Sequence, residues 1–363
     1  MTASILKFFV TMSVCLLLAS CAQTGPPLPP SLELPKPPSD LRASRKGDQV
    51  TLIWSEPTRT TDRQTIRHLG PTRICRSLEA EMKECENAVG ELPPPARSAQ
   101  PSATTQVQPE AFTDTLPAAI QQQNPTGDVT YSVEVLNRDH RGAGLSNRVS
   151  VPAAPTLPPP ADFRAKLNAN GVDFSWTSAG ENSGVSVQHH YRIYRRDDST
   201  GKDAIASEVP AGVAGPMHAQ DSSFEWEKTY LYRVTAVSVA SSPGGEAQVE
   251  GEDSPAVRIV AHDVFPPAVP SGLQAVYSGE GQKPFVDLIW APVTDADLSG
   301  YNVYRRDGAS DVTPIKLNSE LIKSPSYRDS AVASGRKYFY SVSALDVRAN
   351  ESARSEEASE TVP

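Results

Sequence analysis

The chain has 363 residues, of which 38% are hydrophobic, so its length allows two or three domains with modest cores. Its formal net charge of −9 disfavours nonspecific nucleic-acid binding, because that binding requires Lys and Arg to neutralise phosphates. We therefore expect no nucleic-acid partner, and the 33 prolines indicate many turns and linkers.

Residues 1–20 have the pattern of a secretory signal peptide. Lys7 supplies a positive charge, an apolar stretch covers about 8–18, and residues 18–21 read Leu-Ala-Ser-Cys. This stretch is shorter than the roughly 20 apolar residues that a membrane-spanning helix needs. These residues resemble a bacterial lipoprotein signal with its lipobox. The resemblance implies cleavage before Cys21, which would carry acyl chains such as palmitate; an ordinary cleaved signal with an incidental cysteine is the alternative.

The residues after Cys21 predict where the protein is held. Residue 22 is Ala rather than Asp, which by the usual lipoprotein sorting rule favours the outer membrane in a Gram-negative cell. Seven of the eighteen residues from Cys21 to Pro38 are proline, so 21–37 is predicted to be an extended tether of about 3.1 Å per residue. We expect a lipid-anchored protein of the cell envelope, attached to the membrane through Cys21.

One strand pattern then occurs three times along the chain. Val-x-Leu-x-Trp lies at 50–54 and again at 286–290, and Val-x-Phe-x-Trp lies at 172–176. Successive side chains of a strand point to opposite faces, so each copy places three large apolar residues on one face. The copies lie 122 and 114 residues apart, a spacing that indicates tandem domains rather than a solenoid of short repeats.

Two further strand patterns accompany each copy. One has the form Tyr-x-(Ile or Val)-Tyr-Arg-Arg, and the other has the form Tyr-x-Tyr-x-Val-x-Ala, both with weaker versions in the first copy. The matching segments are 72–76, 191–196 and 301–306 for the one, and 129–135, 230–236 and 338–344 for the other. Short strands at this spacing, with almost no helical periodicity, predict antiparallel sandwiches of about 100 residues each.

Together these residues resemble fibronectin type III domains. The resemblance implies an all-β fold, a tandem array of three immunoglobulin-like (fibronectin type III) β-sandwiches, at 38–153, 155–262 and 265–363. It also implies that Tyr230 and Tyr338 are tyrosine-corner residues, whose hydroxyls bond back to nearby backbone. Because a true immunoglobulin domain usually carries a disulfide and 155–363 contains no cysteine, the fibronectin-like version is favoured.

The first and third modules depart from the shared pattern. In the first module Val129 replaces the corner tyrosine, and a Pro-, Ser-, Thr- and Gln-rich insertion at about 91–108 is predicted to be a mobile loop. In the third module the last strand, within 355–362, is weak, so we expect a frayed edge or an edge whose charges block pairing with another chain.

Cys75 and Cys85 are the cysteines that remain after Cys21. A secreted protein is expected to oxidise such a pair, so we predict a disulfide between them that closes a short loop. A metal site would need more ligands, and only His68 is close in sequence. The acidic run at 79–86 is predicted to be a solvated loop.

No catalytic motif is present. The chain lacks His-Glu-x-x-His, Gly-x-Ser-x-Gly, a phosphate loop and Cys-x-x-Cys, so we expect no enzyme, no cofactor and no metal. His189 and His190 should point to opposite faces of a strand as surface or edge residues. The segment 295–297, Asp-Ala-Asp, lacks the spacing of a full calcium loop and is predicted to be a turn.

Trp226 is the single tryptophan outside the repeated pattern. It alternates with Phe224 on what the sequence predicts to be a strand, so the two should share one face, and a place in the core is expected. An exposed aromatic platform for sugar or peptide is the alternative, which makes Trp226 a weak candidate for a binding residue.

These observations favour a membrane-anchored, non-catalytic lipoprotein that acts as an interaction or spacer module in the cell envelope, with a protein partner whose identity is open. The alternative is a carbohydrate- or polymer-binding accessory protein of the cell surface. An exposed Trp226 beside other aromatic residues would favour the alternative. An enzyme with an unrecognised site would need a deep cleft with converging carboxylates or histidines.

Overall fold

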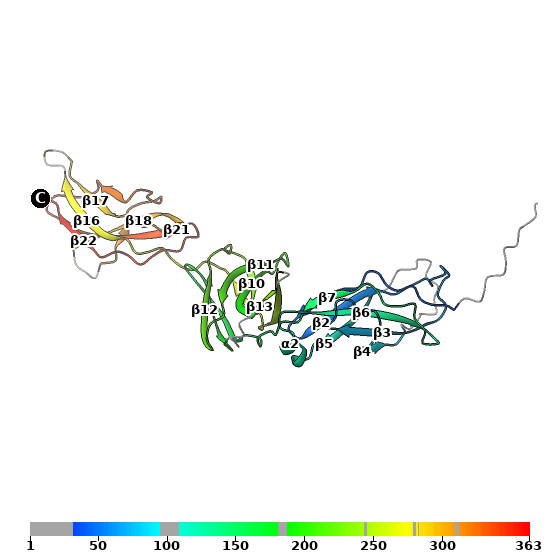
Figure 1. Cartoon of the computed structure of the whole chain (residues 1–363). Coiled ribbons are helices and arrows are strands. Elements are labelled where there is room, and N and C mark those ends of the chain that lie inside the picture. The colour runs from blue at the N-terminus through cyan, green and yellow to red at the C-terminus, as the bar shows by residue number, and fades with distance from the viewer. Residues whose placement is uncertain are drawn as a thin grey trace, which may run out of the picture. The chain divides into compact units, whose positions relative to one another are not determined.

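The computed structural model describes residues 32–94, 109–180, 187–242, 245–278, 281, 283–308 and 312–363. Within these residues, every regular element is a strand except α2 (Ala118–Gln123) (Figure 1). No helix among them has the length and apolar character needed to cross a bilayer. The contacts divide the chain into two compact units, of which the first comprises the described residues up to 158 with 187–189 and 236–252, and the second the remainder.

The first module is a two-layer sandwich. One layer contains three antiparallel strands, and the other contains four. The strands of the first layer are β1 (Arg42–Lys46), β2 (Gln49–Ser55) and β5 (Pro109–Thr115). Those of the second are β4 (Ala88–Leu92), β3 (Leu69–Ser77), β6 (Asp128–Asn137) and β7 (Val149–Pro152), in that order across the sheet. Val50, Leu52 and Trp54 lie in the core between the layers, as the strand pattern predicts.

The middle module repeats this strand arrangement. Its three-stranded sheet has the order β12-β9-β8. In the other layer β10 pairs with β11, and β13 pairs with β15; all of these pairings are antiparallel. The strands are β8 (Ala161–Asn168), β9 (Gly171–Ser178), β10 (Val187–Asp197), β11 (Asp203–Pro210), β12 (Gly215–Asp221), β13 (Thr229–Ser242), β14 (Gly245–Asp253) and β15 (Val257–Val260). Within the first unit, β14 also lies parallel to β1, with Lys46 opposite Glu250.

The third module has the layers β16-β17-β20 and β19-β18-β21-β22. Its strands are β16 (Ser271–Ser278), β17 (Phe285–Ala291), β18 (Leu298–Asp307), β19 (Ile315–Lys316), β20 (Ser326–Asp329), β21 (Lys337–Asp346) and β22 (Ala358–Thr361). The last strand, which the sequence predicts to be weak, pairs with β21 from Lys337↔Thr361 to Tyr340↔Ala358. Val362 follows it and is fully buried in the core, so an apolar anchor holds this edge.

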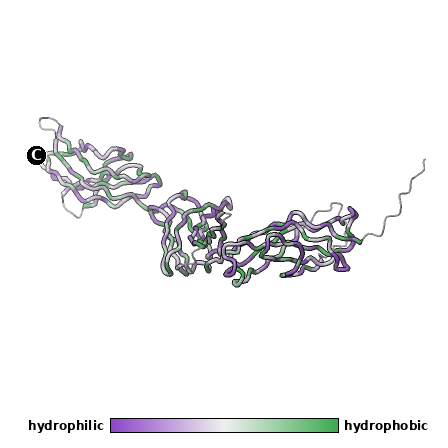
Figure 2. The backbone as a smooth tube through the Cα atoms, in the orientation of Figure 1, coloured by the Kyte–Doolittle hydropathy of each residue, from purple (hydrophilic) through white to green (hydrophobic). Residues whose placement is uncertain are grey.

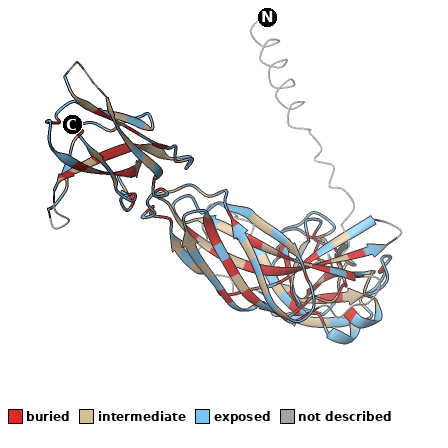
Figure 3. Ribbon diagram, turned by 90° about the vertical axis from the view of Figure 1, so that its left-hand side faces the viewer, coloured by how far each residue is buried: buried red, intermediate tan, exposed pale blue. Residues whose placement is uncertain are grey.

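These strand orders are those of fibronectin type III-like sandwiches, and the predicted all-β fold is confirmed. Hydrophobic and hydrophilic residues alternate along the strands in Figure 2, and buried residues alternate with exposed ones in Figure 3. The tyrosine corners also form as predicted. The backbone N–H of Glu225 donates to the Tyr230 hydroxyl at 3.1 Å, and that of Ala333 donates to the Tyr338 hydroxyl at 2.9 Å.

The last residues of the predicted tether lie on the first module. Asn137 Nδ2 donates to the carbonyl oxygen of Leu32 at 2.9 Å. The backbone N–H of Thr61 donates to the carbonyl oxygen of Leu34, also at 2.9 Å. Pro35 and Pro38 are buried. Residues 32–37, which composition alone assigns to the tether, are therefore held against the sandwich.

Candidate functional site

The predicted sites fall into two groups. Cys21 and the signal peptide lie outside the described residues, and so do residues 95–108 of the predicted insertion, whose first residues, 91 and 92, belong to β4. Cys75, Cys85 and Trp226 lie within the described part of the chain.

Cys75 and Cys85 form the predicted disulfide, with their Cα atoms 5.3 Å apart. Cys75 is fully buried on β3, whereas Cys85 is half-buried in the loop that follows. Met82 packs into the module from this loop, and its carbonyl oxygen accepts a hydrogen bond from Arg148 Nε at 2.8 Å. The glutamates of the loop are exposed, as predicted for a solvated segment.

His189 and His190 are the third and fourth residues of β10 and differ in burial, as alternation predicts. His190 is half-buried, but His189 is buried, so its predicted surface or edge position is wrong. The reason is a polar partner in the interior: His189 Nδ1 lies 3.0 Å from the Ser238 hydroxyl, which also donates to the Pro155 carbonyl oxygen at 2.8 Å. A buried histidine with such a partner is part of the packing.

Each module contains a buried Arg–Asp–Tyr group that the sequence analysis missed. In the third module Arg305 Nη1 lies 2.7 Å from Asp329 Oδ2, and the Tyr340 hydroxyl donates to the same oxygen at 3.0 Å. The corresponding groups are Arg76–Asp114–Tyr131 and Arg195–Asp221–Tyr232. The signal was present, because each arginine occupies the same place in the repeated strand pattern and each tyrosine belongs to the next pattern.

The electrostatics of these groups are those of structural ion pairs. Burial, with the neighbouring carboxylate, raises the pKa of Tyr131, Tyr232 and Tyr340 above the ordinary tyrosine value. The aspartates are almost fully buried, and a buried carboxylate is costly unless it is paired. Each one is compensated by the arginine and the tyrosine hydroxyl of its own group. The groups link the strands of each sandwich.

Trp226 lies in a turn after β12 and not on a strand, so the predicted strand through Phe224 and Trp226 is wrong. The backbone N–H of Ser223 donates to Asp221 Oδ1 at 2.8 Å, and this local side-chain bond ends the strand. Trp226 is half-buried and stands edge-on to Phe224, with ring centroids 4.9 Å apart, and 6.1 Å from the ring of Phe265.

A cavity of about 430 Å³ lies beside this aromatic cluster in the second unit. Its wall combines the rings of Trp226 and Phe265 and two prolines with the carboxylates of three aspartates. The full lining is Ala169, Asn170, Trp226, Asp263, Phe265, Pro266, Pro267, Ala268, Asp295, Ala296 and Asp297. An aromatic face next to acceptor oxygens is suited to a neutral, hydroxyl-rich ligand.

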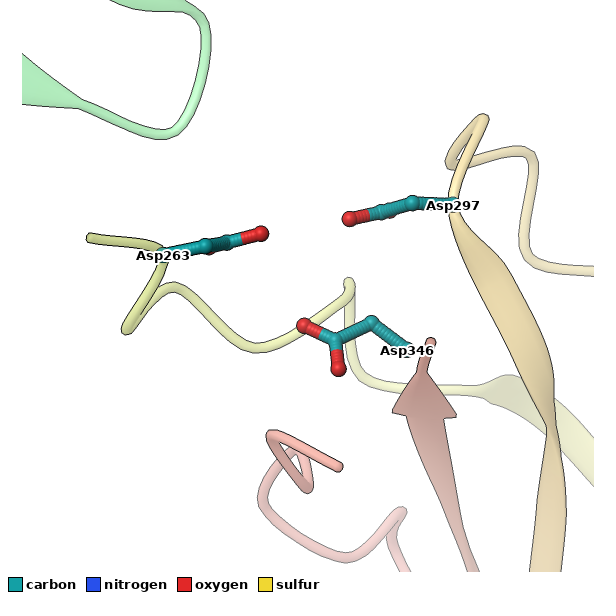
Figure 4. Close-up of side chains that lie close together, drawn as sticks. All are labelled: Asp263, Asp297 and Asp346. Atoms are coloured by element: carbon teal, nitrogen blue, oxygen red, sulfur yellow. The ribbon is translucent and has the colours of Figure 1, made fainter. Parts of the chain in front are cut away.

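Three carboxylates converge beside the cavity (Figure 4). Asp263, Asp297 and Asp346 each place an oxygen within 4.8 Å of the others. Oxygen donors of this kind are those that Ca²⁺ takes, although Ca²⁺ usually has six to eight of them. Asp297 belongs to the segment that the sequence analysis considered, and that segment is the predicted turn, with the Leu298 N–H donating to the Asp295 carbonyl oxygen at 3.1 Å.

Two of these carboxylates are already compensated. Arg348 Nη1 donates to Asp263 Oδ2 at 3.1 Å, and Asn350 Nδ2 donates to Asp346 Oδ2 at 2.7 Å. The backbone N–H groups of Arg348 and Asn350 both donate to Asp346 Oδ1 at 2.8 Å. The protein thus supplies its own cation and amide donors to Asp263 and Asp346, two of the three members of the cluster.

Comparison with known proteins gives distant relatives. No family model matches the chain. Exoglucanase B of Cellulomonas fimi is 29% identical over 213 residues, which are 57% of this chain and 17% of that protein. Ephrin type-A receptor 5 of Gallus gallus is 21% identical over 235 residues, which are 62% of this chain and 21% of the receptor. The chain therefore spans about a fifth of the length of these two relatives.

Solved structures with fibronectin domains also match. The chicken CNTN1 FN1–FN3 domains are 15% identical, cover 91% of this chain over their whole length, and give a TM-score of 0.26. An Fn3-like protein from Clostridium thermocellum is 34% identical, and the match covers 27% of this chain and 94% of that protein, with a TM-score of 0.23. The fold assignment rests on the strand order and tyrosine corners described above.

Proposed function

We propose that the protein is a membrane-anchored, non-catalytic lipoprotein of the cell envelope that acts as an interaction or spacer module. The observation that carries the proposal is the lipobox-like sequence that ends at Cys21, eleven residues before Leu32, where a segment begins that contacts the first sandwich. The repeated buried residues of the fibronectin-like modules pack in the cores. This supports a binding or spacing role for the rest of the chain.

A non-catalytic role is favoured by the state of the converging carboxylates. Asp263 is 3% exposed and Asp346 is 2% exposed, and both carboxylates hold several hydrogen bonds from the protein itself. A hydrolytic pair needs two carboxyl groups that reach the substrate, one of them free to give up a proton. Because Asp263 and Asp346 are buried and hydrogen-bonded to the protein, they are poorly placed to act as such a hydrolytic pair.

The anchor is tested by mass spectrometry of the protein isolated from its native membranes. We expect the mature chain to begin at Cys21 and to carry the mass of a diacylglyceride and an N-acyl chain. A Cys21→Ala variant should remain uncleaved at Ser20 and lose the acyl mass. An unmodified Cys21 in the mature wild-type protein would overturn the proposal.

Carbohydrate binding is the second candidate function, and the aromatic cavity beside Trp226 is the observation that favours it. The similarity to an exoglucanase is compatible with this role. We expect the Trp226→Ala variant to bind insoluble cellulose at least tenfold more weakly than the wild type in a depletion assay. Phe339→Ala, which removes a half-buried aromatic side chain that does not line the cavity, is the matched control. Equal binding by wild type and Trp226→Ala would eliminate this candidate.

A further inference from the structure

Three chain segments meet at one end of the first module, and we name their surface the basic end. The segments are 32–36, 56–68 and 137–142. They are joined by the bonds of Asn137 to Leu32 and of Thr61 to Leu34, and His68 Nδ1 lies 3.7 Å from a carboxylate oxygen of Glu33. Because α2 precedes β6 and 137–142 follows it, the basic end is at the opposite end of β6 from α2 (Figure 1).

Cations outnumber carboxylates on the basic end, although the whole chain carries a net charge of −9. Its six cations are all exposed, and its four carboxylates leave a formal excess of two positive charges. The cations are Lys36, Arg59, Arg63, Arg67, Arg138 and Arg141, and the carboxylates are Glu33, Glu56, Asp62 and Asp139.

Several of these cations are not neutralised by the protein. Among the described residues, no carboxylate oxygen lies within 4.0 Å of the charged groups of Arg59, Arg63 or Arg141. Arg138 has a neighbour, Asp139, at 3.8 Å, but both side chains are 68% exposed, so water screens that pair. Leu32 adds an apolar side chain, 61% exposed, to the same surface.

The sequence fixes how far this surface can be from a lipid anchor. Leu32 is eleven residues beyond Cys21, and a fully extended chain advances at most about 3.6 Å per residue, so the reach is roughly 40 Å. A tether this short keeps the basic end at a high effective concentration near the bilayer. Attraction between exposed charges acts within a Debye length of about 8 Å at physiological salt, so the contact forms when the tether brings the basic end that close to the headgroups.

We propose that the basic end binds the anionic lipid surface to which the chain is anchored. This inference rests on the proposed lipid anchor for its biological setting. Lys and Arg attract phosphate headgroups, and an exposed Leu32 is placed to enter the interfacial region. Membrane attachment then has two signals, the acyl chains and the basic end, and the contact fixes which end of the first module faces the bilayer.

The test uses the unacylated chain from Ala22 to Pro363, which retains every described element and separates this proposal from the anchor. It is sedimented with vesicles of phosphatidylcholine containing 30% phosphatidylglycerol and with vesicles of pure phosphatidylcholine. We expect binding to the anionic vesicles that is at least tenfold stronger than to the neutral ones, and that falls steeply as salt is raised.

Charge-matched variants locate the contact. Arg59→Gln, Arg63→Gln and Arg141→Gln together should weaken binding to the anionic vesicles at least tenfold. Arg164→Gln, Lys166→Gln and Lys202→Gln remove the same charge from exposed sites of the middle module and should leave binding within twofold of wild type. Equal losses in both triple variants, or no preference for anionic vesicles, would overturn the basic end while leaving the acyl anchor at Cys21 untouched.

Discussion

At the scale of single residues, the same buried ion pair is built into each sandwich. In the third module, Asp329 is 3% exposed and accepts from Arg305 and Tyr340, and from the backbone N–H of Ala331 at 2.9 Å. Removing one partner of such a pair leaves a buried, uncompensated charge, which costs far more than the loss of an exposed pair. The third module offers both cases in neighbouring strands.

We expect Asp329→Asn to destabilise the third module by about 3 kcal/mol, because Arg305, whose side chain is 12% exposed, loses the carboxylate at 2.7 Å and keeps only that of Asp307 at 3.6 Å. Asp287→Asn is the matched control: Asp287 also pairs with an arginine, Arg328, at 2.7 Å, but both side chains are exposed, so its cost should stay below about 1 kcal/mol. Hydrogen exchange of peptides from β20 and β21 in the full chain measures both. Similar losses in the two variants would refute the distinction.

The tyrosines of these groups predict alkaline instability. Their pKa is raised in the folded chain by burial and by the aspartates, so folding keeps a proton that the unfolded chain releases above about pH 10. Each tyrosine thus makes its full contribution to the free energy of unfolding below that pH. Above it, the free energy of unfolding falls by about 1.4 kcal/mol per pH unit for each tyrosine. Tyr340→Phe should flatten the fall in urea midpoint between pH 10 and 11.5. An unchanged slope would contradict this.

At the scale of elements, alternation predicted the strands that carry the core but not those shaped by local hydrogen bonds. The Val-x-(Leu or Phe)-x-Trp segments form β2, β9 and β17, because three large apolar residues on one face of a strand are buried in the core between the two sheets. Trp226 was placed on a strand that Asp221 in fact ends. The pairing of β14 with β1 joins segments some 200 residues apart, and no local pattern encodes it.

The disulfide is the element-scale feature with a direct test. Cys85 is half-buried and so accessible to a phosphine reductant, and opening a loop of this size should cost about 2–3 kcal/mol. We expect reduction to increase hydrogen exchange in β3 and β4. Residues 155–363 contain no cysteine, so their exchange serves as the internal control. Unchanged exchange in β3 and β4 after complete reduction would show that the other contacts of the loop, among them Met82 and its bond from Arg148, hold it without the disulfide.

At the scale of the whole molecule, the repeated scaffold was readable from the sequence, whereas the sites between repeats were not. Strand patterns recur at fixed places, and they predicted the three sandwiches and the tyrosine corners of the second and third modules. The acidic cluster takes Asp263 from the segment after β15, Asp297 from the turn before β18 and Asp346 from the end of β21. Residues that meet only after folding leave no spacing to recognise in one sequence, and their charges appear there as scattered surface acids.

Arg348 is the residue on which this cluster depends. It donates to Asp263 and lies 3.4 Å from Glu227, and its guanidinium stands 5.9 Å from the Trp226 ring centroid. We expect Arg348→Gln to lower the melting temperature of the chain at 20 mM NaCl, because the carboxylates of Asp263, Asp297 and Asp346 then repel one another without the Arg348 cation. Raising the salt to 500 mM NaCl should restore part of the lost melting temperature by screening this repulsion. Arg336→Gln removes an equally positive but 64% exposed side chain and should have little effect at either salt concentration. A loss in Arg348→Gln that did not respond to salt would mean that Arg348 acts through packing against Trp226 rather than through its charge.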